Sequence, residues 1–146
     1  EKAVSKNFSV FALVGLVVGY FLGILIVPKI TSQRNFFIIN LLLAVVLTCV
    51  IIMTSGLISI VAVIALSFTH AIMWPAIWPL SIHHLGKHTK LASAFLIMAI
   101  SGGAVLPLVY GKLSDALNPQ IAYALLFVSY AYMIFFALKG SKITKW

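Results

Sequence analysis

Residues 57–84 read LISIVAVIALSFTHAIMWPAIWPLSIHH, and this run decides the fold class. It contains no acidic residue, lysine or arginine. A helix of this length, rising about 1.5 Å per residue, is long enough to cross the ~30 Å hydrocarbon core of a bilayer. The whole chain of 146 residues is 63% hydrophobic and 8% charged, whereas a soluble domain carries about a quarter charged residues. These values predict an integral membrane protein.

Four further apolar runs flank this one, so we predict an all-α protein with five transmembrane helices. Polar residues do not recur at every second position, as a membrane β-barrel would require. Thr54-Ser55-Gly56 predicts a tight turn between antiparallel neighbours, and Asn118-Pro119 is typical of a helix start. The predicted spans are approximately residues 8–27, 35–54, 57–84, 90–112 and 119–138.

The ten basic residues predict the orientation in the membrane. They lie between the apolar runs and give a net charge of +8, which favours a topology signal over a nucleic-acid site. We expect the C-terminus in the cytoplasm, the N-terminus of this chain outside, and a larger protein of which the chain is a piece. The expected cytoplasmic side carries Lys29, Arg34, Lys87, Lys90, Lys139, Lys142 and Lys145, and the opposite side Lys2, Lys6 and Lys112.

Glycines mark one face of the first span. Gly15, Gly19 and Gly23 recur every fourth residue and therefore share a face. Because lipid offers no hydrophobic gain for pairing helices, small residues that allow close backbone approach matter more. We expect this face to pack against a neighbouring helix.

The fourth span contains residues that weaken a helix. Gly102 and Gly103 lower helix stability, and Pro107 removes the donor for the carbonyl of Gly103. We therefore expect a bend near Gly103. Two interpretations are open: inert packing, or a gate in a moving transporter.

Residues 70–80, HAIMWPAIWPL, carry the functional prediction. His70, Trp74 and Trp78 share one face of the third span, while Pro75 and Pro79 each leave a backbone carbonyl without its helical donor. Such carbonyls need protein or water nearby, so we expect this helix to face protein or a wet cavity. Indole faces suit the C–H face of a pyranose, and an imidazole can bond a sugar hydroxyl. The alternatives are an interfacial tryptophan belt and a histidine bonded to a neighbouring helix.

Three other residues are candidates for substrate contacts. Met98 and Ser101 share a face of the small-residue-rich fourth span. Tyr20 lies beside the glycine face, where two interpretations are open: a contact with a polar cavity, or a packing or interfacial-belt tyrosine. A metal site at His83, His84 and His88 is disfavoured because no carboxylate or thiolate supports it. No nucleophile–base pair is apparent, so we predict neither an enzyme nor a cofactor.

Several short motifs resemble the L-fucose permease-like branch of the major facilitator superfamily, the fucose/galactose/glucose–proton symporters. They are an aromatic-Pro element at Trp74-Pro75, a Leu-Gly-x-x-Thr-Lys loop at Leu85–Lys90, a Ser-x-Phe-x-x-Met run at Ser93–Met98, Gly-Gly-Ala at Gly102–Ala104, Gly-x-x-Ser-Asp at Gly111–Asp115 and a glycine element at Gly19–Gly23. Tyr20 stands where that family's glycine element has arginine.

The resemblance covers nearly the whole chain and implies helices eight to twelve of that fold. It places residues 1–146 in a partial C-terminal domain, without the seventh helix and the N-terminal half that supplies the proton-coupling carboxylates. It implies that Trp74 faces the central sugar cavity. The only acids here are Glu1 and Asp115.

Together these features predict monosaccharide transport by alternating access, coupled to protons, in the inner (plasma) membrane of a bacterium. The chain would supply the C-terminal wall of the cavity. Its expected partners are the sugar, membrane lipid, and either the N-terminal half or a second copy. We expect that lobe to dock on the face formed by His70, Trp74 and the fourth span. The alternative function is a non-transporting membrane scaffold.

Overall fold

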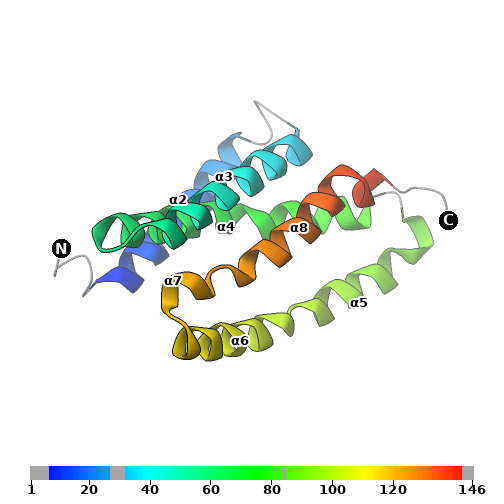
Figure 1. The fold of residues 1–146 in the computed structure, drawn as a ribbon. Helices are drawn as coiled ribbons and strands as arrows, with labels where there is room; N and C mark the ends of the chain where they lie inside the picture. Colours follow the sequence, from blue (N-terminus) through cyan, green and yellow to red (C-terminus); the bar gives the residue numbers. More distant parts are fainter. Residues whose placement is uncertain (1–6, 27–31, 84, 143–146) are drawn as a thin grey trace.

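Helices and short turns make up the described part of the chain (Figure 1). The computed structural model describes residues 7–26, 32–83 and 85–142. Val27 and His84, where two predicted spans end, lie outside these ranges. The helices are α2 (Phe8–Ile26), α3 (Gln33–Met53), α4 (Leu57–Ile82), α5 (Thr89–Ala99), α6 (Gly102–Ala116), α7 (Pro119–Ala122) and α8 (Leu125–Leu138), with 3₁₀ turns η1 (Gly86–His88) and η2 (Gly140–Lys142).

Five segments are long and apolar enough to cross a membrane, with Gly86–Ala116 counted as one segment and Pro119–Leu138 as another. No strand occurs among the described residues. The predicted all-α membrane class is therefore confirmed.

Local sequence signals explain where several helices begin. The Asn118 side-chain oxygen accepts a 2.7 Å hydrogen bond from the Ile121 amide, with Pro119 in the first turn of α7. The Ser32 hydroxyl accepts from the Asn35 amide in the same way at the start of α3. Gly56 adopts φ 65° before α4, in the left-handed region that favours glycine.

The fourth apolar segment is broken between α5 and α6. The break lies at Ile100 and Ser101, just before the Gly102-Gly103 pair, and α6 continues through Pro107 to Ala116. Here the amides of Ser101 and Gly103 bond carbonyls three residues earlier instead of four. The expected bend near Gly103 thus falls two to three residues earlier, where two poor helix formers follow.

A second break separates α7 from α8 at Tyr123 and Ala124. The amides of both residues also bond carbonyls three positions earlier, to Gln120 and Ile121. No glycine or proline lies at this break, so the sequence carried no signal for it.

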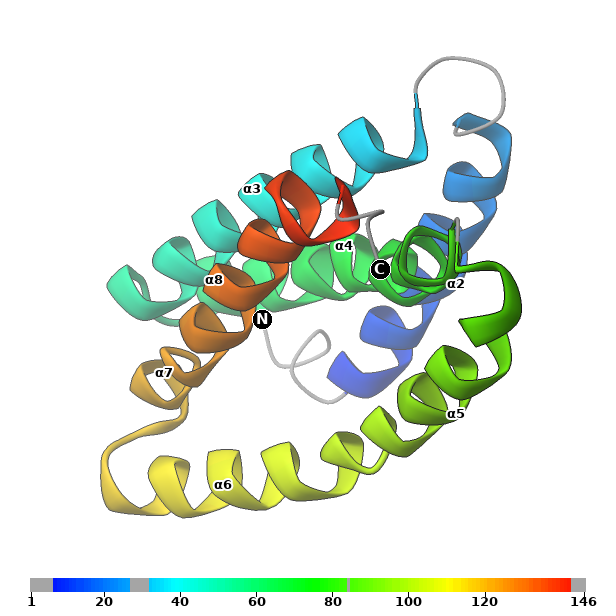
Figure 2. The same cartoon turned by 90° about the vertical axis from the view of Figure 1, so that its right-hand side faces the viewer.

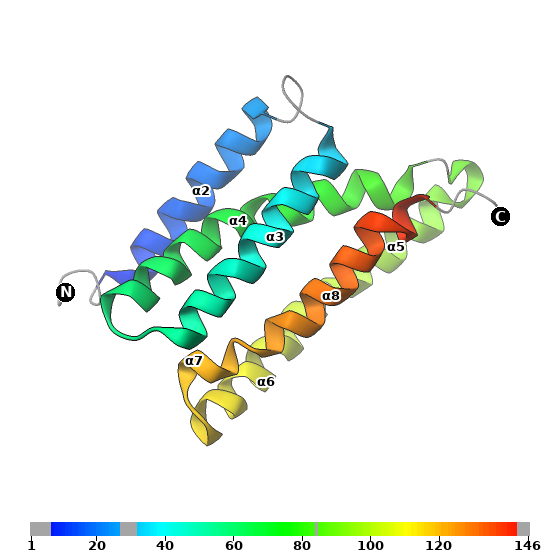
Figure 3. The same cartoon turned by 45° about the horizontal axis from the view of Figure 1, so that its top comes forward.

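The core lies between α3, α4 and α8. α4 packs against both α2 and α3, and α8 packs against α3 (Figure 3). Buried side chains of the core cluster are Phe37, Leu41, Ala44 and Ile51 on α3, Ala62, Leu66, Met73 and Ala76 on α4, and Tyr130 and Ala137 on α8. By contrast, α5 and α6 form an arc at the edge of the molecule (Figure 2), and they contain no buried residue.

Candidate functional site

The indole pair of α4 lies on a partly open face of that helix. The Trp74 and Trp78 rings are 5.8 Å apart at their centroids and are inclined by 65°, an edge-to-face contact. Trp74 is 42% exposed, although Ala71, Met73 and Ala76 beside it are buried. Because the rings are inclined, they form an angled corner and do not share one flat plane.

His70, one turn before Trp74, binds α8. Its Nε2 lies 2.7 Å from the hydroxyl of Tyr130, which is buried in the core. The Thr48 hydroxyl donates to the carbonyl of Ala44 at 2.8 Å and approaches the Tyr130 hydroxyl at 3.5 Å. The histidine therefore links α4 to α8, the arrangement that sequence reasoning weighed as the alternative to a sugar contact.

His70 also lines a cavity of about 320 Å³ between α4, α6 and the α7–α8 segment. Leu66, Leu106 and Leu126 contribute apolar wall, and Ser67, Tyr110 and Ser129 contribute hydroxyls. Its volume is near the lower end of the roughly 300–1,000 Å³ usual for ligand pockets. Neither tryptophan lines it, so the structure places His70 and the indoles in adjacent but different surroundings.

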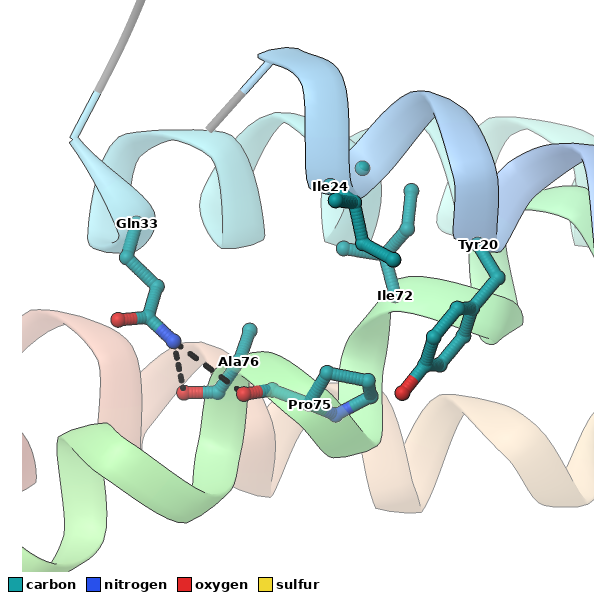
Figure 4. A pocket seen from close by; sticks show the side chains of 7 residues that line it. Tyr20, Ile24, Gln33, Ile72, Pro75 and Ala76 are labelled. Atoms are coloured by element: carbon teal, nitrogen blue, oxygen red, sulfur yellow. Dashed lines mark hydrogen bonds between the residues drawn. The ribbon is translucent and has the colours of Figure 1, made fainter. Parts of the chain in front are cut away.

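Tyr20 lines another cavity, of about 230 Å³, between α2, α3 and α4 (Figure 4). Its side chain points toward Pro75, and Gly23, Ile24 and Ile72 complete much of the apolar wall. At the opposite end, the Gln33 amide nitrogen donates to the Pro75 carbonyl at 3.2 Å and to the Ala76 carbonyl at 3.4 Å. Tyr20 therefore meets the proline-interrupted segment that carries Trp74.

The three glycines of α2 lie directly against α4. A Cβ atom added at Gly19 would be 2.5 Å from the Phe68 carbonyl oxygen, and one added at Gly15 would be 3.0 Å from the Ile64 oxygen. At Gly23 the same atom would lie 3.1 Å from the Ile72 side chain. No larger residue fits at Gly19 without a backbone shift.

The two substrate-contact candidates of the fourth segment are not gathered with the others. Met98 and Ser101 are exposed, and the Ser101 hydroxyl donates back to the Met98 carbonyl at 2.7 Å. A Cβ atom added at Gly102 or Gly103 would meet nothing within 4 Å, and Pro107 lines the His70 cavity. Within the described residues, no group of three or more histidine, cysteine or acidic side chains could hold a metal ion.

Sequence reasoning missed three residues that tie these elements together. Gln33 carried no signal, and Tyr130 was one aromatic residue among many. Arg34 was assigned only to topology, yet its Nε donates to the Ala137 carbonyl at 2.6 Å and its Nη2 to the Leu138 carbonyl at 3.2 Å. It thus satisfies the last carbonyls of α8, where a cation is favoured by the helix dipole.

Comparison with known proteins gives the context for this geometry. Over 128 residues the chain is 36% identical to a protein named "Glucose/galactose transporter" from Brucella abortus biovar 1 (strain 9-941). It is 36% identical over 143 residues to a "Putative glucose/galactose transporter" of Helicobacter pylori (strain ATCC 700392 / 26695). This chain is therefore related to sugar transporters. An "L-fucose-proton symporter" of Escherichia coli (strain K12) is 27% identical over 132 residues.

The predicted resemblance to the L-fucose permease-like transporters is thereby confirmed, and these relatives are named as transporters and not as enzymes. The matches cover 88%, 94% and 85% of this chain but 31%, 35% and 30% of the three relatives. The chain therefore spans about a third of the length of the curated relatives it matches. No family model matches the chain, and no solved structure matches it.

Proposed function

We propose that this chain forms the C-terminal wall of the central cavity in a proton-coupled monosaccharide transporter that works by alternating access. The observation that carries the proposal is the half-exposed Trp74 ring on a proline-interrupted helix, in a chain whose relatives are named glucose/galactose transporters. A ring that large, left open between buried neighbours, offers a stacking surface for the apolar face of a sugar.

The roles of the candidate residues follow from their positions. Trp74 supplies the stacking face, Trp78 holds it by edge contact, and His70 with its Tyr130 partner presents a polar edge at the neighbouring cavity. Movement of the helices would bring three further side chains toward the sugar: Tyr20 of α2, Met98 of α5, and Ser101 between α5 and α6. In the proposed cycle two halves rock about a site near the middle of the membrane.

Partners, coupling and location belong to the same proposal. A second lobe, either an N-terminal half or a second copy, covers the face of His70 and Trp74. Carboxylates of an N-terminal half supply proton coupling, because the only acids of this chain are Glu1 and Asp115. The protein lies in the inner membrane with the C-terminus of this chain in the cytoplasm. The basic residues expected on that side support the orientation.

Uptake of radiolabelled glucose and galactose by the complete gene product in proteoliposomes tests the proposal. We expect uptake driven by an inward proton gradient, abolished by a protonophore and strongly reduced by Trp74→Ala. The matched control is Tyr132→Ala, which removes another exposed aromatic ring, 71% accessible on α8. Correctly folded protein without sugar uptake under any gradient would instead favour the scaffold function.

A further inference from the structure

The proline-interrupted segment of α4 has an unusual backbone requirement. Pro79 has no N–H group, so the carbonyl of Pro75 lacks the helical donor that residue 79 would otherwise provide. In the interior of a bilayer such a carbonyl needs another partner, because lipid cannot provide one. α4 nevertheless continues as a helix through both prolines.

The replacement donor comes from another helix. Gln33 is the first residue of α3, and its amide nitrogen lies 3.2 Å from the freed Pro75 oxygen and 3.4 Å from that of Ala76 (Figure 4). The bond is partly buried, at the edge of the cavity lined by Tyr20 and Ile72. It joins residues 42 positions apart in the sequence. The Gln33 side chain of α3 thus forms a hydrogen bond with α4 at Pro75, the residue that follows Trp74.

We propose that Gln33 is a positioning residue that sets the direction of the Trp74 ring by holding the proline-interrupted segment of α4 at Pro75. The positioning role does not depend on the proposed function. Only its consequence, that sugar affinity depends on Gln33, rests on that function. Gln33 itself need not touch the sugar. When this bond is lost, the segment at Pro75 can shift, and the fraction of molecules in which the Trp74 ring keeps its direction falls.

The chain offers a matched control for the loss of such a bond. Gln120 also donates its side-chain amide to a backbone carbonyl, that of Thr54, at 3.2 Å. That carbonyl lies at the C-terminal end of α3, and no proline of α4 is involved. Gln33→Met and Gln120→Met therefore remove similar bonds with the same isosteric change, but only the first acts on the Pro75 segment.

The test measures Trp74 directly in the full-length protein reconstituted in vesicles. Trp78→Phe and Trp146→Phe, with any tryptophan outside this chain also replaced by phenylalanine, isolate Trp74, and its acrylamide quenching and emission maximum are recorded without sugar. We expect Gln33→Met to change both quantities and Gln120→Met to change neither. In a Pro79→Ala background, residue 79 regains its N–H group, so Gln33→Met should then have little effect.

Equal changes with the two glutamine variants, or a Gln33→Met effect that persists undiminished with Pro79→Ala, would overturn the proposal. Sugar uptake is then measured in the same vesicles with the tryptophans restored. We expect Gln33→Met to weaken the apparent sugar affinity about fivefold, because one neutral hydrogen bond shifts a population by about that factor. An altered Trp74 signal with no sugar uptake in the parent protein would leave the positioning role intact and refute the proposed function.

Discussion

Substitution of Gly19 by alanine should separate α2 from α4. The added Cβ atom would lie 2.5 Å from the Phe68 carbonyl oxygen and 3.1 Å from the Ala71 methyl group. The first distance is about 0.9 Å shorter than ordinary van der Waals contact. The neighbouring atom belongs to the backbone, so no change of side-chain rotamer can relieve the clash. α2 must therefore move away from α4 along this face.

The magnitude follows from two opposing effects. Overpacking a tight contact costs about 1–3 kcal/mol, and a backbone obstacle favours the upper end of that range. Alanine in place of glycine returns about 1 kcal/mol of helix propensity. The net loss should be about 2 kcal/mol, which corresponds to a fall in melting temperature of about 4–8 °C for a protein of this size.

Thermal unfolding of the chain in mild detergent, followed by circular dichroism, measures this loss. The control is Gly103→Ala, because a Cβ atom added at Gly103 meets nothing within 4 Å. The control should leave the melting temperature unchanged or raise it slightly. The packing argument would be refuted if Gly19→Ala had the same melting temperature as the wild type. It would also be refuted if Gly103→Ala had a lower melting temperature than Gly19→Ala.

Three further changes test the side-chain ties between helices. Tyr130→Phe should cost about 1 kcal/mol in detergent unfolding, because it removes the 2.7 Å contact with His70, and the cost should vanish in a His70→Phe background. Arg34→Met should cost about 1.5–3 kcal/mol and speed amide hydrogen exchange at the C-terminal end of α8, because the methionine variant loses the charged donor to the Ala137 carbonyl. Arg34→Lys should have an effect of intermediate size on both measurements. Asn118→Ala should cost about 1 kcal/mol and fray α7, as judged by exchange at the Ile121 amide.

The sequence predicted what depends on local pattern. Apolar runs of membrane-spanning length located the five segments, and the Asn118-Pro119 and Thr54-Ser55-Gly56 signals located helix ends and a turn. These features depend on hydrophobicity, capping and backbone preference over a few residues, so no knowledge of the three-dimensional arrangement is needed.

The bonding partners that the sequence did not identify are far from each other in the chain. Gln33 meets Pro75, Arg34 meets Ala137 and His70 meets Tyr130 at separations of 42, 103 and 60 residues. A proline in a helix predicts that a carbonyl needs a donor, but the donor's identity is set by how helices pack. The 65° inclination of the indoles likewise arises from packing, because a spacing of four residues places side chains on one face without fixing ring angles.

Water accessibility at position 74 tests the central claim most directly. Trp74→Cys in a Cys49→Ser background of the complete gene product, with any other cysteines replaced by serine, would be labelled in sealed vesicles with a water-soluble thiol reagent. Val46→Cys on α3, a position 57% exposed in this structure, would serve as the control. We predict rapid labelling at position 74 that glucose or galactose slows, and slow labelling at position 46 that sugar leaves unchanged. A cysteine at position 74 that resists the reagent and is reached only by lipid-soluble probes would contradict the account.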